Sequence, residues 1–144
     1  MSYTDSDNKN NWYSMIKRTI GLLFIVMAAL TFNSYGQAKI TFKVNLTPQL
    51  EDSVFIPGRD QIYLKGDVFP LSASRKVYLK DTAPVDSVYE TTVNFPSTAS
   101  GKRLNYNFYI RTPDQTMSEQ MKRQLGIGAK DLELNATYFN RFTW

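Results

Sequence analysis

The chain of 144 residues contains no cysteine and no histidine. Without cysteine it forms neither a disulfide nor a thiolate metal site, so a domain of this size must rely on its apolar core for stability. Without histidine it has no Ser-His-Asp triad, no imidazole general base and none of the usual zinc sites. The sequence therefore predicts a protein that is not an enzyme and that needs no cofactor.

The remaining groups for acid–base chemistry are carboxylates, of which Asp67, Asp81 and Glu119 are the candidates. Catalysis by a carboxylate pair requires a fixed separation between the two groups. Nothing in the sequence fixes such a separation here. We expect these residues to be solvated turn residues.

Long charged runs and long apolar runs are also missing. The net charge is only +4, and basic residues such as Lys76, Lys102 and Lys122 are far apart in the sequence. A solvated sheet surface explains this dispersal, so we expect no nucleic-acid partner. The main apolar run, residues 20–32, is shorter than the ~20 residues of a membrane-spanning helix.

That apolar run has the surroundings of a secretory signal peptide. Lys17-Arg18 precedes it, and small or neutral residues follow at Ser34, Gly36 and Ala38. We expect a signal-peptide helix cleaved after Gly36; cleavage after Ala38 and an uncleaved anchor are the alternatives. The sequence thus predicts a leader over residues 1–36 and a secreted, periplasmic or extracellular domain over residues 37–144, with no membrane contact after cleavage.

The first fourteen residues are polar and precede the basic start of the leader. Met15, directly before Ile16-Lys17-Arg18, makes an ordinary start for a signal peptide. We therefore expect translation to begin at Met15, with Met1 as the alternative.

The domain after the leader alternates apolar and polar residues with a period of two, which predicts half-buried strands. The expected strands and extended segments are residues 39–46, 61–65, 76–80, 87–95, 102–110, 116–119, 132–134 and 137–144. Many short strands separated by turn signals predict an all-β, antiparallel β-sandwich. Its expected core is Ile40, Phe42, Val44, Ile62, Leu64, Val93, Tyr106, Phe108 and Ile110.

The connections are less regular. Thr47-Pro48 is expected to end the first strand, because proline cannot donate to a β-ladder, and residues 49–55 have room for a helical turn only. Residues 121–131 are predicted to be irregular or to hold a short strand around Leu125 and Ile127.

Several aromatic residues lie outside the predicted core. Tyr63, Tyr78 and Tyr109 fall on polar strand faces, where cross-strand packing is the expected role. Phe69 lies in a loop; a core plug or loop anchor is the expected role, and a platform for a sugar ring is the alternative.

Several segments together resemble the strand pattern of family 20 carbohydrate-binding modules, the starch-binding domains, over residues 38–124. The segments are ITFKVN at 40–45, FIPGRD at 55–60, QIYLKGD at 61–67, YETTV at 89–93 and YNF at 106–108. FIPGRD is similar to an insertion in members from Bacteroidetes. The resemblance implies an immunoglobulin-like sandwich.

Members of that family bind glucan with two tryptophans and a lysine, and the resemblance implies where these fall here. The first tryptophan corresponds to the segment with Phe69, the lysine to Asn107, and the second tryptophan and its following glutamate to the segment from Met117 to Glu119. A following arginine corresponds to Arg123. Both family tryptophans are absent, since the only ones in this chain are Trp12 and Trp144.

Taken with the predicted leader, the resemblance implies an exported, non-catalytic starch- or glucan-binding module with a weakened or lost sugar site. An α-glucan is then the expected polysaccharide partner. The alternative is an accessory protein-interaction domain, or a detached N-terminal domain of an envelope hydrolase.

Overall fold

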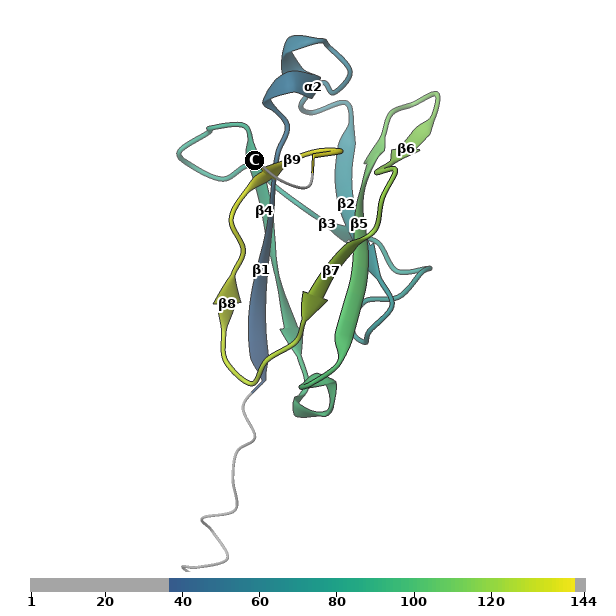
Figure 1. Cartoon of the computed structure of the whole chain (residues 1–144). Coiled ribbons are helices and arrows are strands. Elements are labelled where there is room, and N and C mark those ends of the chain that lie inside the picture. Colours follow the sequence, from purple (N-terminus) through teal and green to yellow (C-terminus); the bar gives the residue numbers. More distant parts are fainter. Residues whose placement is uncertain (1–36, 142–144) are drawn as a thin grey trace, which may run out of the picture. The chain divides into compact units, whose positions relative to one another are not determined.

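We describe residues 37–141 of the chain from a computed structural model (Figure 1). The predicted signal-peptide helix, the predicted start at Met15 and residues 142–144 lie outside the described residues. Within residues 37–141, no helix has the length and apolar character needed to cross a membrane.

Sheet A is built on the first strand. β1 (Ala38–Asn45) pairs antiparallel with β4 (Val88–Phe95) over its whole length. On its other edge β1 pairs with two short strands, β8 (Leu132–Glu133) and β9 (Thr137–Tyr138), and both run parallel to it. The expectation of a purely antiparallel sandwich is therefore wrong at this edge, because the chain returns to β1 from the opposite sheet.

Sheet B is built on β2 (Gln61–Gly66) and β5 (Arg103–Arg111), which pair antiparallel. β3 (Val77–Tyr78) covers the outer edge of β2. β6 (Thr116–Ser118) and β7 (Arg123–Gly126) follow one another along the other edge of β5, and residues 119–122 interrupt them. From β7 the chain crosses to sheet A and enters β8 (Figure 1).

The alternating apolar residues of the two sheets meet in one core. Phe42 of β1 packs edge-on against Tyr106 of β5, with ring centres 5.0 Å apart. This contact places the two sheets face to face. All nine residues predicted for the core are buried: Ile40, Phe42, Val44, Ile62, Leu64, Val93, Tyr106, Phe108 and Ile110. The prediction of an all-β protein is confirmed.

The connections differ in part from expectation. Pro48 does more than end β1, because it lies in the first turn of a short helix, α2 (Thr47–Glu51), where a proline's missing N–H costs nothing. A 3₁₀ turn, η1 (Ser97–Ala99), joins β4 to β5. Of the two alternatives for residues 121–131, the short strand is present as β7, which contains Leu125 and ends one residue before Ile127.

Phe69 is not a core plug, because 71% of its surface is exposed. Leu71, two residues later in the same loop, is buried instead and contacts the backbone of β2 at Gly66. Gly66 is needed there, because a Cβ atom would lie 2.9 Å from Leu71 Cδ1 and equally close to Leu104 Cδ1. The loop is thus fixed by the smaller apolar residue, and its phenylalanine faces solvent.

Candidate functional site

The outer face of sheet B carries a row of tyrosines. Tyr63 lies in the centre, stacked on Tyr109 of β5 with ring centres 5.3 Å apart and meeting Tyr78 of β3 edge-on at 5.8 Å. The predicted cross-strand packing is therefore confirmed. Tyr63 is only 2% exposed, and its burial raises the pKa of its hydroxyl. Tyr109 is half-buried and lines the groove described next.

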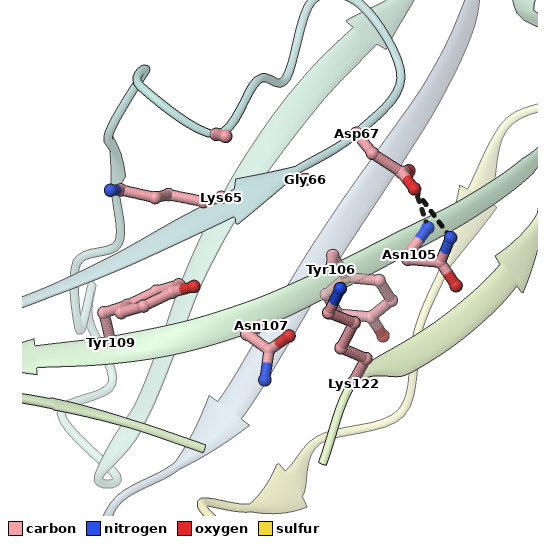
Figure 2. Close-up of a pocket in the computed structure, with 9 residues that line it drawn as sticks. Lys65, Gly66, Asp67, Asn105, Tyr106, Asn107, Tyr109 and Lys122 are labelled. Carbon is pink, nitrogen blue, oxygen red and sulfur yellow. Dashed lines mark hydrogen bonds between the residues drawn. The ribbon is translucent and has the colours of Figure 1, made fainter. Parts of the chain in front are cut away.

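A shallow groove of about 130 Å³ lies next to this row, where β2 and β5 run side by side (Figure 2). Alternation along the two strands places Lys65, Asn105, Asn107 and Tyr109 on the outer face of the sheet. Lys122, from the interruption between β6 and β7, completes one side of the groove. Figure 2 shows Lys65 and Lys122 on opposite sides, with Asn107 between them.

Asp67 and Asn105 form the polar end of the groove. The Asn105 backbone N–H donates to Asp67 Oδ1 at 2.8 Å, and its carboxamide nitrogen donates to Oδ2 at 2.6 Å. Partial burial alone would raise the pKa of Asp67, but the hydrogen bonds from Asn105 lower it below its ordinary value. These bonds fix both the start of the β2–β3 loop and the side chain of Asn105.

Asn107 is held just as firmly in the floor of the groove. Its carboxamide nitrogen donates to the backbone carbonyls of Glu119 at 3.2 Å and Met121 at 3.0 Å. Both partners belong to residues 119–122, so Asn107 also holds this interruption against β5. Its carboxamide oxygen accepts no hydrogen bond from the described part of the chain, which leaves an oriented acceptor in the groove.

Beneath this interruption lies a buried ion pair between Glu119 and Arg123. Arg123 Nη2 donates to Oε1 at 2.6 Å and Nε donates to Oε2 at 2.9 Å, a bidentate arrangement. The backbone N–H of Phe108 donates to the same Oε2 at 3.1 Å. Glu119 is only 3% exposed, so this pair replaces the regular ladder where β6 and β7 fail to join.

The ion pair also connects the two sheets. Arg123 donates to the Thr137 hydroxyl and, at 3.0 Å, to the carbonyl of Tyr138, both in β9 of sheet A. The Asn140 N–H donates to Glu119 Oε1 at 3.0 Å. The chain after β8 is therefore held in place by polar contacts to sheet B.

The five residues implied by the family resemblance are only partly together. Asn107 lies in the groove, and Glu119 and Arg123 lie buried beside it with partners inside the chain. Met117 packs against the core. Phe69 is exposed in the β2–β3 loop. Sugar contact by these five residues stays a prediction. Glu119 and Arg123 are buried, and their contacts inside the chain stabilise the interruption between β6 and β7.

The three carboxylates considered for acid–base chemistry are each occupied separately. Asp67 accepts from Asn105. Glu119 is buried and paired with Arg123, so the expectation of a solvated turn residue is wrong for it. Asp81 accepts from the backbone N–H of Ser87 at 3.0 Å, as expected of a turn residue.

Sequence reasoning did not select Lys65, Asn105, Tyr109 and Lys122 as site residues. The sequence pattern could have indicated three of them. Asn105 and Tyr109 lie two residues before and after Asn107 on the same strand, and so on the same face. Lys65 lies opposite Asn107 on the neighbouring strand β2. Lys122 had no such signal, since it follows an irregular interruption of the strand.

Neither the protein-family models nor the curated proteins give a match to this chain. The site is therefore judged on its chemistry. It offers a partly open tyrosine ring, two fixed carboxamides and two ammonium groups in an open groove. Such a surface can stack a flat apolar face and hydrogen-bond hydroxyl groups around it.

Proposed function

We propose that this protein is an exported, non-catalytic carbohydrate-binding module with an immunoglobulin-like sandwich, similar to the family 20 starch-binding domains. The observation that carries the proposal is the groove on the outer face of sheet B. There the half-buried ring of Tyr109 lies beside the fixed carboxamides of Asn105 and Asn107 (Figure 2).

The groove provides both kinds of contact that a sugar needs. A pyranose ring presents a weakly apolar face, which a tyrosine ring can cover, and a rim of hydroxyls, which amide and ammonium groups can bond. The carboxamides of Asn105 and Asn107 are already oriented by internal hydrogen bonds, so little side-chain entropy is lost on binding. With one tyrosine as platform we expect weak binding of a neutral glucan, with Kd near the millimolar range, about −4 kcal/mol.

Export is part of the same proposal. We propose cleavage after Gly36 and release into the periplasm or the medium. Ala38 is the first residue of β1, is buried and pairs with Phe95 of β4. Cleavage after Gly36 leaves β1 whole, whereas cleavage after Ala38 removes a paired residue, which supports the first cut.

A protein-interaction domain, or a detached domain that accompanies an envelope hydrolase, is the second candidate. Large apolar side chains on the surface favour it: Phe69 is 71% exposed and Met121 is 63% exposed. Exposed apolar side chains of this size can serve as contact points with another protein. This candidate predicts no sugar binding.

Titration of the ¹⁵N-labelled full chain with maltoheptaose, followed by NMR, distinguishes the two. The carbohydrate proposal predicts shifts at Asn105, Asn107 and Tyr109, and their loss in a Tyr109→Leu variant. A Val85→Ala variant in the distant β3–β4 loop serves as control, because Val85 is exposed and lies outside the groove. No shifts at millimolar maltoheptaose would overturn binding of a neutral α-glucan and favour the protein-interaction candidate.

A further inference from the structure

Resting on the proposed function, we infer that the groove on the outer face of sheet B selects an acidic polysaccharide, a chain of uronate-type sugars, over a neutral glucan. The inference rests on three lysines, distant in the sequence, that the fold brings to this face. Lys65 and Lys122 line the groove itself. Lys76 lies at its tyrosine row, with Nζ 5.1 Å from the centre of the Tyr63 ring.

Lys65 is in position to act on a ligand that covers Tyr109. Its Nζ lies 5.3 Å from the centre of the Tyr109 ring and 5.9 Å from that of Tyr63. A sugar ring placed over the open part of Tyr109 would therefore bring its substituents close to this ammonium group. A carboxylate on that sugar gains a charge-assisted hydrogen bond, which is roughly twice as strong as a neutral one.

Little negative charge opposes these lysines. Among the described residues, the one carboxylate that lines the groove is Asp67, at its polar end, where Asn105 holds both oxygens. It keeps its negative charge, and attraction to Lys122 helps to lower its pKa. Two lysines and one aspartate line the groove, so one positive charge is left over there. Within residues 37–141, no carboxylate lies within salt-bridge distance of Lys65, Lys76 or Lys122. The salt bridges found there join Lys43 to Glu90 and Glu133, Arg59 to Asp60, and Arg123 to Glu119.

The outer face of sheet A shows the opposite arrangement. Lys43 Nζ, on β1, lies 2.5 Å from Glu133 Oε1 and 3.5 Å from Glu90 Oε2. Its positive charge is therefore compensated by two carboxylates. Hydrogen bonding to Glu133 raises the pKa of Lys43 accordingly. Two faces of one small domain thus differ in charge balance, and the face that carries the groove keeps an excess of positive charge.

The shape of the groove favours an extended ligand over a compact anion. It is open and shallow, and Lys65 and Lys122 stand on opposite sides of it, with Asn107 between them (Figure 2). Two ammonium groups on opposite sides of an open groove suit a ligand that is long enough to extend across it. A polymer with a carboxylate on each sugar can meet both while one of its rings covers Tyr109.

Isothermal titration calorimetry of the full chain with three oligosaccharides tests the inference. The first is an oligogalacturonate, the second is its fully methyl-esterified form, which keeps the backbone and removes the charge, and the third is maltoheptaose. We expect the acid form to bind at least about tenfold more tightly than the ester at 20 mM salt. The difference should shrink at 200 mM salt, because exposed charges are then screened.

Substitutions locate the effect in the groove. Lys65→Gln and Lys122→Gln should each weaken binding of the acid form several-fold and leave binding of the ester unchanged. Lys130→Gln removes an exposed charge outside the groove and should change neither. Tyr109→Leu should weaken both forms alike, since it removes the platform and no charge.

Each result decides one of the two claims. Equal affinity for acid and ester, or an acid preference that neither lysine substitution reduces, overturns the inference and leaves carbohydrate binding in place. Absence of binding by all three oligosaccharides overturns the proposed function itself. Binding of maltoheptaose alone supports a neutral-glucan module and also overturns the inference.

Discussion

At the scale of single residues, Phe108 joins the apolar core to the buried ion pair. It is 1% exposed, packs edge-on against Tyr106, and carries the Arg123 guanidinium 5.1 Å above its ring. Phe108→Ala leaves a cavity under the buried ion pair, and we expect it to reduce the free energy of unfolding by roughly 3–5 kcal/mol. Urea denaturation measures this, and a loss under about 1 kcal/mol would contradict the packing described.

Asp67 gives the residue-scale prediction for pH. Its folded pKa lies below the ordinary value of 3.8, so its contribution to stability is present above pH 4 and is lost as the pH falls through the folded pKa. Asp67→Asn should therefore flatten the fall in unfolding free energy between pH 4 and pH 2. Denaturation curves recorded across this range check the prediction. An unchanged pH dependence of the unfolding free energy would show that Asp67 does not contribute to acid sensitivity.

At the scale of elements, β2 and the loop that follows it pack closely at Gly66. A Cβ on Gly66 would lie 2.9 Å from both Leu71 Cδ1 and Leu104 Cδ1, whereas a Cβ on Gly126 of β7 would meet nothing within 4 Å. We expect Gly66→Ala to destabilise the protein by about 1–3 kcal/mol. Gly126→Ala is the matched strand control, and thermal unfolding that affects both equally would refute the steric explanation.

The interruption between β6 and β7 depends on the Glu119–Arg123 ion pair. Arg123→Met leaves a buried carboxylate without its partner and should cost about 3–5 kcal/mol. The double variant Glu119→Gln/Arg123→Met removes both charges, so we expect it to recover part of that loss. A double-mutant cycle by urea denaturation measures the coupling, and additive losses would show that the two residues act independently.

At the scale of the whole molecule, sheets A and B share one continuous core from Ile40 to Phe139. No part of that core is large enough to be stable by itself, because a small domain buries a limited share of its surface. We expect a chain of residues 37–144 to unfold in one cooperative step. Coincident urea transitions by circular dichroism and tyrosine fluorescence check this, and two separate transitions would contradict it.

The sequence by itself determined the four long strands and the nine core residues predicted on them, because alternation of apolar and polar residues is a local property that one buried sheet face imposes on each strand. It also placed Asn107 on the polar face of its strand. Phe69 and Leu71 show the limit: both are apolar residues of one loop, and only the space beside Gly66 decided which of them is buried.

Tertiary structure alone decided the parallel pairing of β8 and β9 with β1, since two-residue strands carry no period and are held by contacts such as Arg123 to Tyr138. It also decided the charge of the groove. Lys65 and Lys122 are far apart along the chain, so the sequence alone predicts two separate solvated lysines. Pairing of β5 with β2 on one side and β7 on the other brings them to one groove, because register places residues side by side regardless of their separation in sequence.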